Sequence, residues 1–447
     1  MSVSFSVNSY RTVWHLAWPI ILSNLSVPLL GAVDTAVIGH LPDPAYLGAV
    51  GIGAMIFSFL YWGFGFLKMG TTGFVAQAAG AEDTTRIRTI LAQSFILSIC
   101  ISLAILCLQY PVRELALYLI DPTDAVASGT TEYFNHRIWG APAALMNYAL
   151  LGFFVGLGRM RTALVLQVVM NGANILLDLF FVIGLDMKVP GVALATTLSE
   201  YLAVFLGLTF AWRELTRMGG EWLRKDILSL GQMGRLMSVN FNIFIRTILL
   251  IVSFSYFTVS AARLGDEVLA AVTVAMNFVY FLSFGLDGFA HAASTLVGKA
   301  VGAKDQKGVD QAVWVSSSMA LIVAVLYMFL YAVLGDRIIN LLTTIESVRL
   351  LAYEFVPWLV AMPLIAVWSY QFDGIFVGAM KSSEMRNGMI LSFAAYFLAI
   401  KGLGEPFGAD GLWAALCVFM VMRGLTLAFV YPRVRRAALP AGQEKIS

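Results

Sequence analysis

Twelve long apolar stretches, separated by short polar segments, constrain this chain more than any other feature of its sequence. A helix needs about 20 apolar residues to cross the hydrocarbon core of a bilayer. Only 13% of the residues are charged and 59% are hydrophobic, whereas about a quarter of a soluble domain is charged. The sequence therefore predicts an all-α integral membrane protein. The expected spans are 14–38, 46–72, 88–110, 136–157, 162–184, 190–212, 236–262, 268–297, 309–333, 351–378, 387–403 and 411–432.

Basic residues are distributed unevenly over the segments between these spans. If the N-terminus is cytoplasmic, the cytoplasmic segments hold 19 Lys and Arg residues and the opposite segments hold seven, Arg137 among them. Cytoplasmic loops of membrane proteins carry the excess of positive charge. We therefore expect a multi-pass protein with both termini in the cytoplasm. As a separate expectation, its membrane is a bacterial-type inner (plasma) membrane. The opening residues have no small-residue cleavage site, so we expect the first span to be retained.

The sequence repeats itself at an offset of 222 residues. "LGAVGIGAMIFSFLYWGFGFLKMGTTGFVAQAAGAED" at 47–83 aligns without a gap with "LAAVTVAMNFVYFLSFGLDGFAHAASTLVGKAVGAKD" at 269–305. The same offset aligns "GFFVG" at 152–156 with "GIFVG" at 374–378. Each half holds six spans, so both halves enter the membrane from the same side. This pattern predicts two lobes related by an axis along the membrane normal.

The predicted domain organisation follows from this repeat. It consists of a cytoplasmic tail at 1–13, an N-lobe at 14–212, a cytoplasmic linker at 213–235, a C-lobe at 236–432 and a cytoplasmic tail at 433–447. Two such lobes suit alternating access, in which a site near the midplane faces each side of the membrane in turn. A channel or a receptor needs no such architecture.

Polar residues inside the spans of the first lobe are candidate functional residues, because an ionisable residue at mid-bilayer costs about 2.5–3.5 kcal/mol. Asp34 lies in the first span. Asn174 and Asp178 share one face of the fifth span, with Asn171 one turn before them, and Thr196 opens the sixth. Carboxylate, amide and hydroxyl oxygens suit a proton or a small alkali cation. The alternative is that these side chains only hydrogen-bond neighbouring helices and hold the bundle together.

The second lobe has its own ionisable residues within spans, namely Arg246, Asp287 and Asp373. The residues that align with the two aspartates at the 222-residue offset are not acidic. This indicates that each lobe has its own set of polar groups and that the repeat does not share them. Arg246 lies too deep to reach the surface easily, so it is either a counter-ion for a carboxylate of this lobe or a substrate contact. With Asn171, these three residues are candidates for a substrate cleft or a C-lobe polar site.

Two prolines, Pro19 and Pro28, lie within the first span. Each removes a helical hydrogen bond and favours a kink. A helix that bends and also carries Asp34 would couple the protonation of this carboxylate to the shape of the helix. The alternative is that these prolines are not hinges, because prolines are common in membrane helices.

Several stretches together resemble the multidrug and toxic compound extrusion (MATE) family. They are "WHLAWPIILSNLSVPLLGAVDTAVIGHL", "RIWGAPAALMNYALLGFFVGLGRMRTAL", "NGANILLDLFFVIGL" and "GVALATTLSEY", and "FVGAMKSSEMRN" and "LDGFAHAA" are similar to the DinF branch. The resemblance implies two six-helix lobes that export amphipathic, often cationic compounds in exchange for H+ or Na+. It implies a proton or cation site at Asp34, Asn174, Asp178 and Thr196 and helix bending at Pro19.

Two other functions stay open at this stage. A flippase for lipids or lipid-linked oligosaccharides would have a similar lobed build but needs a large basic cleft, and basic residues within the spans are few. An intramembrane enzyme is more remote, because no Ser-His or Cys-His arrangement and no aspartyl-protease pair of motifs stands out. The expected partners are amphipathic small molecules and the bilayer. We expect no cofactor, no nucleic acid and a monomer, with H+ or Na+ as the coupling ion.

Overall fold

The computed structural model describes residues 7–39 and 43–439, and these residues are almost entirely helical. Within this part of the chain, 11 helices are long and apolar enough to cross a membrane. The first predicted span falls on α1 (Val7–Gly39), where several side chains lie outside the description. The prediction of an all-α membrane protein is confirmed.

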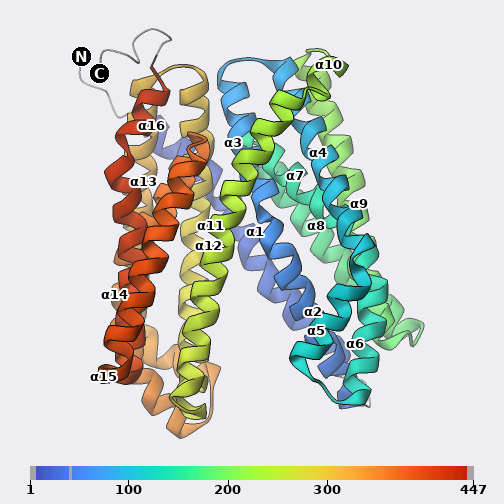
Figure 1. Cartoon of the computed structure of the whole chain (residues 1–447), viewed down its shortest axis with the longest axis vertical. Coiled ribbons are helices and arrows are strands. Elements are labelled where there is room, and N and C mark those ends of the chain that lie inside the picture. The colour runs from blue at the N-terminus through green and yellow to red at the C-terminus, as the bar shows by residue number, and fades with distance from the viewer. Residues whose placement is uncertain (1–6, 40–42, 440–447) are drawn as a thin grey trace. The chain divides into compact units, whose positions relative to one another are not determined.

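The chain forms two compact units. The N-unit comprises Leu22–Ala79 and Asp83–Leu236, and the C-unit comprises the described parts of Met1–Ile21, Gly80–Glu82 and Met237–Ser447. Figure 1 labels the α-helices. After α1, the elements up to α10 are α2 (Pro44–Trp62), η1 (Gly63–Gly65), α3 (Phe66–Gly80), α4 (Thr84–Cys107), α5 (Gln109–Ile120), α6 (Asp124–Arg137), η2 (Ile138–Gly140), α7 (Ala141–Leu157), α8 (Met160–Asp178), η3 (Leu179–Gly184), α9 (Lys188–Met218) and α10 (Arg224–Ile227). The later elements are α11 (Leu230–Arg263), α12 (Asp266–Gly302), α13 (Gln306–Leu342), α14 (Glu346–Gly378), α15 (Ser382–Val430) and α16 (Pro432–Ala437).

The first helix is divided between the two units, although the sequence places all of its span in the N-lobe. Up to Ile21, α1 belongs to the C-unit, where Val13 and Ala17 are buried in the apolar core and Ser9 Oγ accepts a hydrogen bond of 2.8 Å from Gln311 Nε2. From Leu22 onward it belongs to the N-unit. Hydropathy finds the span but does not show which neighbours each half of it contacts.

The 222-residue repeat is visible in the helix boundaries. The helices that start at Pro44, Thr84, Asp124 and Met160 have counterparts that start at Asp266, Gln306, Glu346 and Ser382, each 222 residues later. Backbone turns with positive φ recur at the same offset, at Glu82 and Lys304, at Gly158 and Met380, and at Asp186 and Gly408. The last of these turns divides α15 into two helices, which accounts for two of the predicted spans.

The repeated sequence motifs have physical causes in these turns. In the endings "GAED" and "GAKD", the final aspartate caps the next helix. Asp83 Oδ1 accepts a hydrogen bond from the Arg86 backbone N–H at 2.8 Å, and Asp305 Oδ1 accepts one from the Gly308 backbone N–H at 2.9 Å. A carboxylate in this position satisfies one of the free N–H groups at a helix start.

The glycines of "GFFVG" and "GIFVG" allow close helix packing. A Cβ atom at Gly152 or Gly156 would lie 2.5 or 2.7 Å from a carbonyl oxygen of α3, that of Lys68 or Thr72. In the C-unit, the same atom at Gly374 or Gly378 would overlap a carbonyl oxygen of α12, that of Ala290 or Ser294. Small residues four apart allow membrane helices to approach closely. The motif is therefore a repeated helix contact within each unit.

The segment predicted as a linker, 213–235, is largely ordered against the N-unit. Residues up to Met218 continue α9, and residues from Leu230 start α11. Between them, the buried Arg88 of α4 donates to the carbonyl oxygens of Leu215 (2.6 Å) and Gly219 (2.9 Å), and its guanidinium lies 5.1 Å from the ring centre of Trp222. Helix α9 ends before Gly219, where φ is 74°, and Arg88 satisfies carbonyl oxygens that are free at this C-terminus.

Candidate functional site

A buried polar cluster joins α8 and α9 in the N-unit. Asn174 and Asp178 lie one turn apart on α8, and both are buried, with 1% and 0% of their surface exposed. Thr196 faces them from α9, and its Oγ1 lies 3.1 Å from the side-chain amide of Asn174. The structure thus brings together three of the four residues that the sequence predicts for the proton or cation site.

The hydrogen-bonding geometry favours one orientation of the Asn174 amide. In that orientation its nitrogen donates to Asp178 Oδ2 at 3.2 Å, and its oxygen accepts from the backbone N–H and the hydroxyl of Thr196, both at 3.1 Å. The amide then links the carboxylate of one helix to the hydroxyl of the next. The cluster presents carboxylate, amide and hydroxyl oxygens, which are hard donors suited to a proton or a small cation.

The remaining first-lobe candidates lie on or near α1. Asp34 is helical in α1, but its side chain lies outside the described residues. Pro19 is buried, and α1 stays helical through it, so bending at this residue stays a prediction. Asn171 donates to Ser26 Oγ of α1 at 2.9 Å and accepts from Gln167 at 3.0 Å. It therefore connects α8 to α1, one turn before Asn174.

A cavity of about 250 Å³ lies inside the N-unit on the other side of Gln167. Its polar lining consists of Tyr61, Asn147, Tyr148, Gln167 and Glu200, and its apolar lining includes Leu166 and Met170. Gln167 also donates a hydrogen bond to Asn171. This bond links the wall of the cavity to the row of polar side chains on α8 that starts at Asn171 and continues to Asn174 and Asp178. A small apolar cavity with a few convergent polar groups is the usual form of a ligand site.

Glu200 is held in this cavity wall by an arginine. Arg137 donates to both carboxylate oxygens, with Nη1 to Oε2 at 2.9 Å and Nη2 to Oε1 at 2.5 Å. The guanidinium also lies over the rings of Phe57 and Tyr61, at 5.3 and 5.2 Å from their centres. Both partners are buried, so the sequence-based placement of Arg137 in an outer loop is wrong. The span begins earlier, because α6 starts at Asp124.

The C-unit contains a second ionic cluster. Asp373 of α14 forms ion pairs with Arg246 of α11 and with Arg423 of α15, the latter at 2.6 Å. The exposed fractions of the three side chains are only 13%, 8% and 4%. Of the two roles that the sequence leaves open for Arg246, the geometry supports the counter-ion. Asp287 of α12 lies close enough to interact electrostatically with Arg246 and with Tyr370.

Sequence reasoning missed three members of these clusters, Arg137, Glu200 and Arg423. Glu200 in "TTLSEYLAVF" and Arg423 in "FMVMRGLTL" carry the same signal that identified Asp34, a charge within an apolar run. Each is paired with a residue on another helix, and no spacing along the chain predicts such a pair.

The sequence matches a family model over both halves of the chain. The MatE model matches residues 19–180 and 242–402. The chain belongs to the MATE family. It is 39% identical over 433 residues to the DNA damage-inducible protein F of Escherichia coli, covering 96% of this chain and 94% of that protein. It is 25% identical to a probable multidrug resistance protein NorM of Bacillus cereus, with 90% of each chain covered.

Solved structures of MATE transporters share the fold. The bent form of the Vibrio cholerae MATE transporter VcmN has a TM-score of 0.84 at 20% identity and covers 96% of this chain and 98% of that chain. A MOP superfamily transporter from Pyrococcus furiosus has a TM-score of 0.83 at 18% identity, with 97% of each chain covered. The two-lobed twelve-helix MATE fold is therefore confirmed. The relatives and structural neighbours are transporters and not enzymes, so the intramembrane enzyme is excluded.

Proposed function

We propose that this MATE protein is a multidrug efflux antiporter that exports amphipathic, often cationic compounds in exchange for inward H+, by alternating access. Na+ is the alternative coupling ion. The observation that carries the proposal is the buried cluster of Asn174, Asp178 and Thr196. A charged carboxylate with no exposed surface is costly in a membrane, so its protonation state depends strongly on what else occupies the site.

Two other carboxylates of the described residues are buried and bound by cations of the protein. Glu200 and Asp373 are held by arginine side chains, so their negative charge is already compensated by the protein itself. Asp178 is also buried, and its Oδ2 atom accepts a hydrogen bond from the amide of Asn174, which in turn accepts from Thr196. In this proposal Asp178 and Asp34 exchange the coupling ion, and the neighbouring cavity accepts part of the substrate.

The cavity supports an amphipathic substrate. Tyrosine rings and the Met170 thioether provide a soft apolar wall, and Asn147 and Gln167 provide polar contacts. In this proposal, proton entry from the outside releases the compound while α1 bends at Pro19, in a protein of the inner membrane with cytoplasmic termini.

Transport by purified protein in liposomes tests the proposal. A fluorescent cationic dye is followed under an imposed pH gradient and, separately, under an imposed Na+ gradient. We expect the pH gradient to drive dye movement and Asp178→Asn to abolish it. The matched control is Asp124→Asn, the same change at an exposed carboxylate of α6. Size-exclusion chromatography checks that each variant is folded.

The outcomes separate the alternatives. Undiminished pH-driven transport by Asp178→Asn would remove this residue from the mechanism. A response to the Na+ gradient alone would replace H+ by Na+ as the coupling ion. A failure to move any dye, combined with movement of a lipid-linked sugar across the same liposomes, would favour the flippase.

A further inference from the structure

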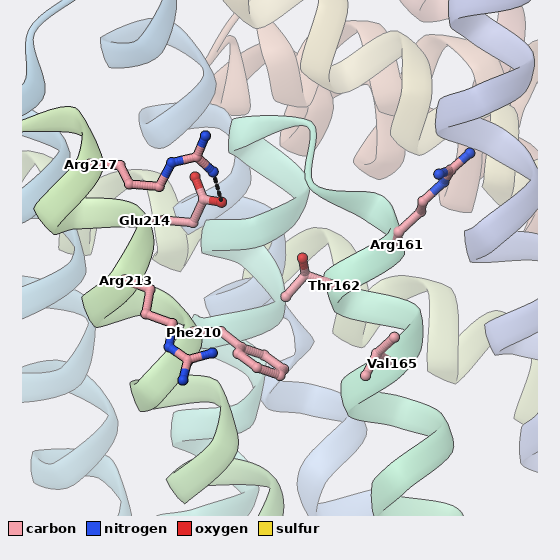
Figure 2. Close-up of a pocket in the computed structure, with 7 residues that line it drawn as sticks. All are labelled: Arg161, Thr162, Val165, Phe210, Arg213, Glu214 and Arg217. Carbon is pink, nitrogen blue, oxygen red and sulfur yellow. Dashed lines mark ion pairs between the residues drawn. The ribbon is translucent and has the colours of Figure 1, made fainter.

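The N-unit has two hollows that differ in how their polar groups are used. One lies between the first turns of α8 and the last turns of α9 (Figure 2). There the Arg161 side chain is directed away from Arg213. The Glu214 carboxylate is already paired with Arg217 at 3.7 Å, so the charged groups of this hollow do not converge on one ligand. The other hollow is the cavity of about 250 Å³ that Glu200 lines.

A tyrosine hydroxyl in the wall of this cavity has no hydrogen-bond partner. Tyr61 of α2 is only 7% exposed, and its Oη atom is buried and forms no hydrogen bond within residues 7–39 and 43–439. A second tyrosine of the wall, Tyr148 of α7, also forms no side-chain hydrogen bond with the described part of the chain. Because an unsatisfied buried polar group costs stability, two unused hydroxyls at one cavity indicate that a ligand bonds to them.

The amide side chains of the wall leave their oxygen atoms unused. Asn147 Nδ2 donates to the backbone carbonyl oxygen of Glu200 at 3.0 Å. Gln167 Nε2 donates to Asn171 Oδ1, also at 3.0 Å. The Oδ1 atom of Asn147 and the Oε1 atom of Gln167 accept no hydrogen bond from any described residue. Since an amide oxygen has two lone pairs, the acceptors that remain for a ligand outnumber the donors.

The charge in the cavity wall is compensated within the protein. Glu200 is the one acidic lining residue, and its two carboxylate oxygens accept from Arg137 at 2.9 and 2.5 Å. Tyr61 and Tyr148 lie close enough to Glu200 to interact with it electrostatically, so both hydroxyls lie beside this ion pair. A cationic ligand would therefore be held by hydrogen bonds to neutral oxygens and not by a free carboxylate.

We propose that this cavity selects protonated amines that carry N–H groups over quaternary ammonium compounds. The inference rests on the proposed function, because it takes the cavity as the substrate site. The N–H groups of an ammonium donate to the amide and phenol oxygens, and Leu166 and Met170 contact the apolar part of the molecule. A quaternary ammonium has no hydrogen to donate. A site built to bond an N–H group rejects an analogue that lacks it, because the polar groups of the site are then left unpaired.

Ligand binding to the purified full-length protein in detergent tests this selectivity without transport. The probes are a dansyl compound with a primary ammonium group on an alkyl chain, its trimethylammonium counterpart and its neutral hydroxyl counterpart. We expect the trimethylammonium probe to bind about 10- to 100-fold more weakly than the primary ammonium probe, the range for one hydrogen bond with a charged partner. Equal binding of these two probes would overturn the proposal. Equal or tighter binding of the hydroxyl probe would also overturn it, because the charge would then contribute nothing.

The variant Tyr61→Phe tests the unpartnered hydroxyl. We expect it to weaken binding of the primary ammonium probe by about tenfold. It should not lower the unfolding temperature, because the hydroxyl has no partner among the described residues. The matched control is Tyr331→Phe in the C-unit, which removes a hydroxyl that donates to the carbonyl oxygen of Phe278 at 2.7 Å. The control should lower the unfolding temperature and leave binding unchanged. Unchanged binding by Tyr61→Phe, or equal weakening by the control, would overturn the proposal.

Transport in liposomes separates this inference from the proposed function, with protein-free liposomes as the reference for passive movement. If the primary ammonium probe binds selectively but neither a pH gradient nor a Na+ gradient moves it through the protein, the antiport fails and the selectivity stands. If a gradient moves the trimethylammonium probe as effectively as the primary ammonium probe, the selectivity fails and the antiport stands.

Discussion

Removing one partner of the buried Arg137–Glu200 pair should destabilise the N-unit more than any loss of a surface ion pair. The two side chains are 6% and 11% exposed, and both guanidinium nitrogens that face the carboxylate donate to it. Arg137→Met would leave the Glu200 carboxylate buried without its cation. Breaking a buried pair in this way costs about 3–5 kcal/mol, because the remaining charge has lost its compensation.

The double variant is expected to recover much of this loss. Arg137→Met/Glu200→Leu removes both charges and fills the space with apolar groups of similar size, a change that is often neutral or stabilising. The single variants and the double variant therefore form a cycle with a large coupling energy. A matched cycle on Arg159 and Glu214, which are 49% and 17% exposed, should give only about 0–1 kcal/mol.

The measurement is reversible unfolding of the purified protein in mixed micelles, followed by tryptophan fluorescence as the denaturing detergent fraction rises. Near-equal free energies of unfolding for Arg137→Met and Arg159→Met would refute the reasoning. So would a double variant that is less stable than either single variant, because the pair would then contribute through contacts other than charge compensation.

Four further variants test packing and charge elsewhere. Gly374→Ala should lower the free energy of unfolding by about 1–3 kcal/mol, because the added Cβ atom would overlap the backbone of α12. The control is Gly172→Ala, where the added Cβ atom meets open space, and it should raise the free energy of unfolding by up to about 1 kcal/mol in the same assay. Asp373→Leu leaves two buried arginines without their carboxylate and should lower the free energy of unfolding by about 3–5 kcal/mol. Arg88→Gln should release the end of α9, so trypsin should cut within 213–235 faster than in the unaltered protein.

Hydropathy and internal alignment predicted the helical class, the twelve spans and the parallel repeat, because these depend on local composition and on the register of the chain. The four-residue spacing of Asn174 and Asp178 also placed both on one helical face. The partners of these residues could not be predicted in this way. Thr196 was a candidate from its place in the sixth span and from the family resemblance, but the sequence does not show that it contacts Asn174. Arg137 meets Glu200, which lies 63 residues later in the chain, through a contact between helices that only the fold determines.

The boundary errors have a similar cause. Arg137 was assigned to a loop because a charged residue normally marks the end of a span, yet here the charge is compensated inside the bundle. The predicted linker is mostly helix, and between its helices Trp222 contacts Arg88, which is far from it in the sequence. In each case a tertiary contact makes a polar segment stable where composition alone predicts exposure.

The exact correspondence of helix starts and left-handed turns 222 residues apart gives this protein an internal control for mutational scanning. Where both copies of a position serve packing, as at Gly152 and Gly374, tolerance to substitution should be the same in the two units. Where one copy carries chemistry, as at Asp178, whose counterpart is Ile400, the two tolerance profiles should differ. Comparing the two tolerance profiles would therefore distinguish residues that are needed for the packing of a lobe from residues that give the two lobes different functions.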